Sequence, residues 1–269
     1  MSRLVLTLKA DPAERLDMRA IVPSTLAGKS LREIEGLVIG TTNAPLTVAD
    51  VFKVSGQPGE ALAIAGGSPR LDCVGCALDG GNVTVEGDVG AYAGAGMTGG
   101  KLTVHGNAGL QLGGSMKGGF IHVTGQAGDE AGGMVSGGRY GMQGGAMVVE
   151  AGIGARAGHR MRRGTIVTRG RFGEGAGTRM MGGTLWTETG FDADPGMQMR
   201  RGTLIGPSVA RLLPTFGDGG WHDLVILRIL SRDATARLGS LAPKPLPAKV
   251  RKYSGDLGMF GKGELLLTA

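Results

Sequence analysis

The sequence is poor in aromatic residues and cysteine, and it has no long hydrophobic run. Aromatics make up 4% of the 269 residues, too few for a sandwich or α/β core built on large rings. Two cysteines, Cys73 and Cys76, cannot form a disulfide framework, and the N-terminus lacks the apolar core of a signal peptide. No stretch approaches the roughly 20 apolar residues of a membrane span. We therefore expect a cytoplasmic protein without a membrane segment.

Glycine is the abundant residue, with 53 copies. Collagen is excluded because these glycines do not recur at every third position. Disorder is disfavoured because 41% of the residues are hydrophobic and recur in register with the glycines. The composition therefore indicates an ordered repeat.

The repeat is 19 residues long and occurs seven times between about residues 78 and 206. One step is 26 residues instead, and the seven extra residues fall around Met134 to Gly141, which predicts a loop there. The residues that begin the repeats are Leu78, Met97, Met116, Met142, Met161, Met180 and Met199.

Each repeat continues with a glycine pair or a variant of it, and then with a short alternating segment such as Leu102-x-Val104. Alternation with period two places these apolar residues on one face of a strand. One strand cannot bury that face alone, so repeats of this kind stack and pair in parallel. The prediction is a mainly β fold: a parallel β-helix of about seven 19-residue coils, right-handed as parallel crossovers usually are.

The flanks predict a division into three parts. Residues 1–60 form an α/β cap with a strand at Arg3–Lys9 and a helix after Ser30. Residues 61–206 form the β-helix, beginning with a degenerate coil at Leu62 and Ile64. Residues 207–269 form a helix over His222–Leu238 and, from Ala242, an extended tail, both packed on the β-helix.

An apolar column faces outward on the later coils, at Val148, Val167, Trp186 and Ile205. Such a stripe needs a cover. Either the C-terminal helix of the same chain or another subunit would provide it.

A second column is basic. Between Met142 and Thr215 there are ten arginines, five carboxylates and no lysine. Arginine without lysine favours bidentate recognition of carboxylate or phosphate, whereas nucleic acid is disfavoured because aromatic residues for base stacking are missing nearby. The candidate binding residues for an anionic tail or an acidic partner are Arg160, Arg162, Arg163, Arg179, Arg200 and Arg201.

Candidates for catalysis or metal binding are weak. Glu150, Arg169 and Glu188 alternate in sign and predict a surface ion-pair ladder. The pair Asp129 and Glu130 has no accompanying base. The four histidines share no column, and the two cysteines are expected to be small buried thiols rather than zinc ligands or redox groups. We therefore predict no catalytic and no metal site.

Coils such as Met97–Gly113 and Met116–Gly132 resemble the glycine-repeat β-helix domain shared by the C-terminal part of glutamate synthase and the C subunit of formylmethanofuran dehydrogenase. The N-terminal cap and the segment Tyr253–Leu265 resemble the second family. An alanine-, glycine- and arginine-rich composition favours its bacterial relative, the C subunit of the formyltransferase/hydrolase complex.

This resemblance implies a non-catalytic scaffold subunit in one-carbon metabolism. Such a complex moves a formyl group from tetrahydromethanopterin to a methanofuran-type cofactor and hydrolyses it to formate. The implied partners are a formyltransferase subunit, an amidohydrolase-type metal subunit and a further small subunit, in a hetero-oligomer. A glutamate-synthase-type structural domain and a β-helix enzyme acting on polysaccharide remain alternatives.

Overall fold

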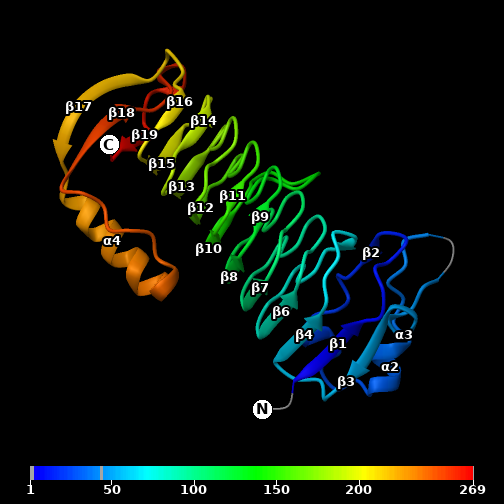
Figure 1. The fold of residues 1–269 in the computed structure, drawn as a ribbon. Helices are drawn as coiled ribbons and strands as arrows, with labels where there is room; N and C mark the ends of the chain where they lie inside the picture. The colour runs from blue at the N-terminus through cyan, green and yellow to red at the C-terminus, as the bar shows by residue number, and fades with distance from the viewer. Residues whose placement is uncertain (1–2, 43–44, 269) are drawn as a thin grey trace.

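A single large sheet runs the length of the molecule in the computed structural model, which describes residues 3–42 and 45–268 (Figure 1). Nine of its neighbouring pairs, from β1 to β19, are parallel, and the strands at its two ends add antiparallel pairs. In spatial order the strands are β17 (Gly217–Asp223), β18 (Lys249–Ser254), β19 (Glu264–Leu267), β15 (Arg201–Gly206), β13 (Met181–Thr187), β12 (Arg163–Thr168), β10 (Gln143–Val149), β8 (Phe120–Val123), β7 (Lys101–Val104), β6 (Asn82–Glu86), β4 (Ala61–Ala65), β1 (Leu4–Leu8) and β3 (Phe52–Ser55). The predicted mainly β fold with parallel pairing is confirmed.

The strands pair in the register that the sequence repeat predicts. Leu102 lies opposite Ile121, and Ile166 opposite Leu185, so residues at the same repeat position are neighbours. A second ladder links the same repeats through isolated bridges, among them Val89 to Ala108, and through short strands. These strands are β2 (Leu16–Asp17), β5 (Leu71–Asp72), β9 (Gln126–Ala127), β11 (Gly152–Ile153), β14 (Phe191–Ala193) and β16 (Val209–Arg211). Each repeat is thereby bonded to the next at two places along its length.

The interior between the two ladders is filled by the predicted apolar columns. The methionines that begin the repeats are fully buried, and Phe172 stacks on Phe191 with ring centroids 5.3 Å apart. Methionine suits this narrow space because its unbranched side chain adapts to irregular gaps. The core is therefore continuous along the stack.

The glycine pairs are explained by contact between successive repeats. A Cβ added at Gly99 would lie 2.2 Å from the carbonyl oxygen of Asp79 in the repeat below. Where arginine replaces the first glycine of the pair, at Arg163 and Arg201, the sheet shows a register irregularity beside it. The irregularity accommodates a side chain that the regular stack excludes.

The N-terminal segment joins the sheet through β1 and β3 and confirms the expected strand. The helices are α1 (Pro23–Leu26), α2 (Leu31–Glu35) and α3 (Val48–Val51). The predicted helix after Ser30 is α2, and it begins at a capping box in which Ser30 Oγ accepts from the Glu33 N–H while Glu33 accepts from the Ser30 N–H.

The C-terminal segment differs from the prediction. The helix α4 spans Val225–Leu238 rather than beginning at His222, because residues 217–223 form β17, which pairs with β18. After α4 and a 3₁₀ turn at Gly239–Leu241, the tail does not simply run extended. It forms β18, a second 3₁₀ turn at Leu257–Met259, and β19, which pairs in parallel with β15 and covers the last repeat.

The outward apolar stripe is covered by the chain's own helix. Val148, Val167, Trp186 and Ile205 are all buried in one cluster with apolar residues of α4. The residues that α4 contributes are Leu227, Ala234 and Leu238. The sequence left open whether the C-terminal helix or another subunit covers the stripe, and the structure shows that the chain's own helix does.

The opposite face of α4 leaves apolar side chains in contact with solvent. Val225, Ile226 and Ile229 are exposed there, and Trp221 of the neighbouring β17 is 59% exposed. These four residues are called the α4 outer face below. No helix among the described residues combines the length and apolarity that crossing a membrane requires.

Candidate anion-binding pocket

A surface cavity of about 530 Å³ lies at one corner of the later repeats. Four arginines contribute to its wall, together with one tyrosine, one glutamine and two methionines. The lining residues are Arg139, Tyr140, Arg160, Arg179, Met181, Gln198, Arg200 and Met259. The cavity is therefore strongly basic, and we call it the arginine pocket.

Three of the lining residues occupy one position in successive repeats. Arg160, Arg179 and Gln198 are 19 residues apart and have φ values of 55°, 55° and 58°. Gly96 has the equivalent place in an earlier repeat, with φ +68°. Left-handed backbone costs little for glycine but of order 1 kcal/mol or more for other residues. This backbone conformation makes a sharp corner in each repeat and places the three side chains beside one another. The Arg179 Nε donates to Gln198 Oε1 over 2.8 Å.

The seven-residue insertion builds the opposite wall. The centroid of its Tyr140 ring is 5.2 Å from Cζ of Arg139 and 5.1 Å from Cζ of Arg162. The Ser115 hydroxyl donates to the Tyr140 carbonyl oxygen and ties the loop to the stack. Cation–π contacts of this kind hold the two arginines near the pocket without neutralising them.

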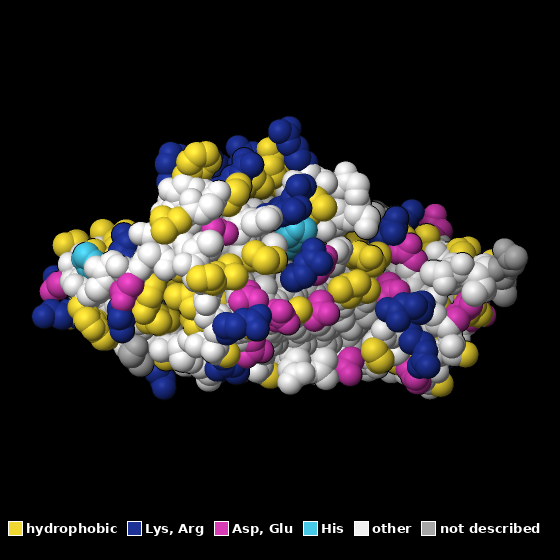
Figure 2. Space-filling model, turned by 90° about the horizontal axis from the view of Figure 1, so that it is seen from above, with side chains coloured by type: hydrophobic (Ala, Val, Ile, Leu, Met, Phe, Trp, Pro, Cys, Tyr) yellow, Lys and Arg dark blue, Asp and Glu magenta, His cyan; other side chains and the backbone are white. Residues whose placement is uncertain are grey.

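The pocket arginines carry uncompensated charge. Among residues 3–42 and 45–268, no carboxylate lies within 4.0 Å of Arg139, Arg160, Arg179 or Arg200. The same holds for Arg162, Arg163 and Arg201 nearby, whereas Arg156, Arg169, Arg171 and Arg211 are each paired with a carboxylate. Figure 2 shows one group of lysine and arginine side chains on a projection of the elongated molecule, and further basic side chains along the rest of the visible face. Clustered, unpaired guanidinium groups in a concave site attract anions and bind carboxylates bidentately.

A buried histidine lies directly behind the pocket. His159 is 7% exposed, and its pKa is lowered mainly by burial and then by the positive charges of Arg156, Arg160 and Arg179, against the opposing effect of Glu130. Because Arg160 and Arg179 also line the pocket, the pKa of His159 reports on the electrostatic potential there.

The six arginines predicted from sequence are distributed as follows. Arg160, Arg179 and Arg200 line the pocket, and Arg162 stacks on its Tyr140. Arg163 and Arg201 begin β12 and β15 and do not belong to the lining. The basic column in the sequence did not indicate five further lining residues, which are Arg139, Tyr140, Met181, Gln198 and Met259. The insertion was the available signal for the first two, and it brings an aromatic side chain into a region that is otherwise poor in them.

The predicted ion-pair ladder is only half formed. Glu150 contacts Arg169 at 3.4 Å and His122 at 2.8 Å, but Glu188 instead accepts a hydrogen bond from the backbone N–H of Lys244. The tail passing over this corner supplies that donor.

The two carboxylates beside the insertion, Asp129 and Glu130, do not act as a pair but contact different partners. Asp129 accepts from the Ala155 N–H, while Glu130 contacts Arg156 at 3.2 Å. Within the described part of the chain, no three histidine, cysteine or acidic side chains form a group able to hold a metal ion.

Comparison with known proteins gives a consistent result. No protein-family model matches the chain. A chain in the crystal structure of the formyltransferase/hydrolase complex from Methylorubrum extorquens, solved in complex with methylofuran, is 42% identical, with a TM-score of 0.89, over 98% of this chain and 99% of that one. The chain therefore belongs to a family of repeat proteins found as subunits of formyl-transferring complexes.

Curated sequences identify which of the subunits it resembles. The C subunit of the Methylorubrum extorquens formyltransferase/hydrolase complex is 48% identical over 85 residues, 32% of each chain. The C subunit of the tungsten-containing formylmethanofuran dehydrogenase 2 from Methanothermobacter marburgensis is 35% identical over 101 residues, which is 36% of this chain and 37% of that one. These aligned segments span only about a third of the curated relatives. Together with the full-length structural match, they make this chain a member of the C-subunit family, as the sequence resemblance predicted.

Proposed function

We propose that this chain is the non-catalytic scaffold, the C subunit, of a cytoplasmic formyltransferase/hydrolase complex in one-carbon metabolism. The observation that carries the proposal is the match in fold and sequence over nearly the whole length of a chain from such a complex. The chain would organise a formyltransferase subunit, an amidohydrolase-type metal subunit and a further small subunit.

The long stack of repeats suits a structural support for other subunits. We infer that the stacked repeats of residues 61–206 form a parallel right-handed β-helix, capped by residues 1–60 at one end and by residues 207–269 at the other. Parallel ladders at two places in each repeat support this arrangement. A stack of this kind is long and stiff, and its side walls remain available for partners.

The α4 outer face is the proposed docking surface for a partner subunit. The apolar stripe of the sheet is buried under α4 and is therefore not available to a partner. The exposed apolar side chains in this region are instead Trp221, Val225 and Ile229. Exposed tryptophan and aliphatic side chains in one patch are typical of the energetic centre of a protein interface.

The arginine pocket is the proposed site for the anionic tail of a methanofuran-type cofactor. Four unpaired guanidinium groups fit a chain of carboxylates, and the homologous complex was crystallised with methylofuran. An acidic surface of a partner subunit is the alternative occupant. The reacting end of the cofactor would be handled by the other subunits, with this chain holding and orienting the tail.

An omission and add-back assay tests the scaffold role. The isolated chain is expected to show neither formyl transfer nor hydrolysis, while adding it to its separated partner subunits should raise the rate of linked transfer and hydrolysis at least about tenfold, since holding reactive groups together raises their effective concentration. Turnover of formylated cofactor or of a polysaccharide by the isolated chain would contradict the proposal. So would a linked rate that does not depend on the added chain.

A further inference from the structure

The two cysteines lie together at a surface cavity on the early repeats. The insertion that contributes Arg139 and Tyr140 to the arginine pocket also contributes two residues to this cavity. The cavity has a volume of about 450 Å³, and the first of the cysteines comes directly after the short strand β5. Its lining includes Arg19, Cys73, Cys76, Tyr92, Val135 and Ser136. Both cysteines are free; Cys73 is 7% exposed and Cys76 is half-buried.

The backbone places Cys73 at a corner rather than in the core. Its φ is 59°, and the equivalent position of the next repeats carries Tyr92, Gln111 and Glu130, all with positive φ. The Cys76 N–H donates to the Cys73 carbonyl oxygen over 3.0 Å and closes a tight turn, and both residues line the same cavity. The expectation of small buried thiols is confirmed for Cys73, whereas Cys76 is only half-buried, and both residues also line the cavity.

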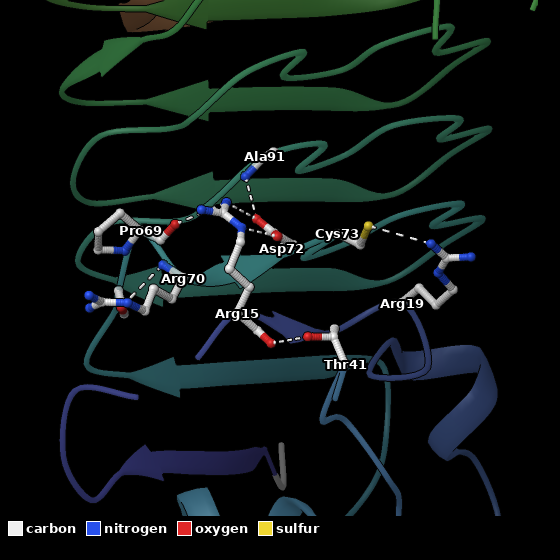
Figure 3. Close-up of polar contacts among 9 residues, drawn as sticks. Arg15, Arg19, Thr41, Pro69, Arg70, Asp72, Cys73 and Ala91 are labelled. Carbon is white, nitrogen blue, oxygen red and sulfur yellow. Dashed lines mark hydrogen bonds and ion pairs between the residues drawn. The ribbon is translucent and has the colours of Figure 1, made fainter. Parts of the chain in front are cut away.

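Polar groups surround the Cys73 sulfur. The Arg19 Nη2 lies 3.9 Å from it, and Figure 3 shows this guanidinium reaching toward it from the N-terminal segment. The Cys76 thiol donates to the Tyr92 carbonyl oxygen over 3.4 Å, and the Cys73 sulfur is its alternative acceptor. The guanidinium and the Cys76 thiol both stabilise a negative charge on Cys73.

The electrostatics follow from these contacts. The Cys76 hydrogen bond and then Arg19 lower the pKa of Cys73 to about 7, against the opposing effects of burial and of the Asp17 carboxylate, which is itself 3.0 Å from Arg19. The pKa of Cys76 is raised by the same hydrogen bond, by burial and by the negative charge on Cys73. About half of Cys73 is thus thiolate at neutral pH, while its neighbour keeps its proton.

We propose that Cys73 and Cys76 form a peroxide-reactive dithiol, in which Cys73 is the nucleophile, Cys76 resolves the product into a disulfide, and Arg19 positions and activates Cys73. A low-pKa thiol beside a second cysteine and a cation is the arrangement that thiol oxidation requires. Zinc binding is disfavoured, because two thiols without further ligands among the described residues do not complete a tetrahedral site.

The chemistry balances in two steps. The Cys73 thiolate attacks the terminal oxygen of a hydroperoxide, an S–O bond forms, the O–O bond breaks, and the departing alkoxide takes a proton from solvent. The sulfur is oxidised by two electrons to a sulfenic acid and the peroxide is reduced to an alcohol. Cys76 then loses its proton and attacks the Cys73 sulfur. The S–S bond forms, and hydroxide leaves and is protonated to water.

The test uses the full-length chain and hydrogen peroxide as the probe. One molar equivalent should convert the chain to an intramolecular disulfide, seen by mass spectrometry as the loss of two hydrogens. In Cys76→Ser, oxidation should stop at a sulfenic acid on Cys73 that dimedone traps. Because the sequence has only two cysteines, both products are assigned without ambiguity. Absence of the disulfide in the unmodified chain, or of a trapped sulfenic acid in Cys76→Ser, would overturn the proposal.

A matched pair of arginine variants tests the role of Arg19. Arg19→Ala should slow oxidation of Cys73 at pH 7 by a few-fold, which is less than the roughly tenfold expected for an unperturbed thiol with a pKa near 8.5, because the larger effect of Cys76 remains. Arg15→Ala removes the same charge from the same segment but contacts Asp72 rather than sulfur, so its rate should match the wild type. Equal rates for all three chains would refute activation by Arg19.

The unmodified chain provides a measurement that depends on no variant folding. The rate of Cys73 alkylation by iodoacetamide, followed against pH, should have its midpoint near pH 7. A midpoint near the ordinary thiol value of about 8.5 would exclude an activated Cys73.

Discussion

Replacing Arg160, Arg179 and Arg200 together by glutamate is expected to lower the affinity of the chain for an oligoglutamate probe at least about 1,000-fold. Each charge-assisted hydrogen bond to a carboxylate contributes about 1.5–3 kcal/mol, so three lost together cost at least about 4.5 kcal/mol before repulsion is added. The three guanidinium groups line one cavity and have no carboxylate partner among the described residues. Isothermal titration calorimetry at low salt measures the effect.

The matched control is the double variant Arg163→Glu with Arg201→Glu. Both residues belong to the same basic region and lie outside the pocket lining, so the change in affinity should be less than about threefold, the size expected for exposed charges. An equal loss in both variants would contradict a built site and indicate attraction by the general positive field.

The histidine behind the pocket gives a second observation. Burial and the neighbouring arginines lower the pKa of His159. A bound anion offsets the positive potential and favours the protonated ring, so adding the probe should raise this pKa in a ring-proton NMR titration. A downward shift, or none at saturating probe, would contradict binding in the pocket.

Gly99→Ala is expected to destabilise the fold by about 3 kcal/mol, near the upper end of what overpacking costs. The new Cβ would lie 2.2 Å from the Asp79 carbonyl oxygen, and backbone on both sides must move because neither repeat has a free edge at this point. Thermal unfolding followed by circular dichroism should show a fall in Tm of roughly 6–10 °C for a chain of this size.

Gly80→Ala is the control at the same repeat position. Its Cβ would meet nothing within 4 Å, because the step from β4 to β6 is 21 residues rather than 19 and the segment beneath follows a different path. The free energy of unfolding should change by less than about 1 kcal/mol. If both alanines proved equally tolerated, close contact between repeats would not explain the glycine pairs.

The repeat could be predicted from sequence because one physical constraint recurs in every turn. The parallel register, the buried methionine column and the helix after Ser30 all follow from local pattern. The start of α4 could not be predicted in the same way. Residues 217–223 are extended because β18 lies beside them, and that partner comes from a segment about 30 residues later in the sequence.

The candidate site could be predicted only in part, for a related reason. Periodicity placed Arg160 and Arg179 in one column, but it cannot show where an insertion folds back. Arg139 and Tyr140 reach the pocket because Ser115 ties their loop to the stack, and Met259 reaches it because the tail returns to cover the last repeat. Contacts made by irregular segments depend on tertiary structure, and no repeat in the sequence reveals them.

Purification of the tagged full-length chain from its own host tests the scaffold assignment most directly. At low ionic strength the chain should be recovered in a stoichiometric hetero-oligomer with a formyltransferase subunit and an amidohydrolase-type metal subunit, identified by mass spectrometry. Substituting Trp221 and Ile229 by aspartate should release at least one partner if the α4 outer face is the docking surface. Recovery of the unmodified chain as a lone monomer would contradict the account.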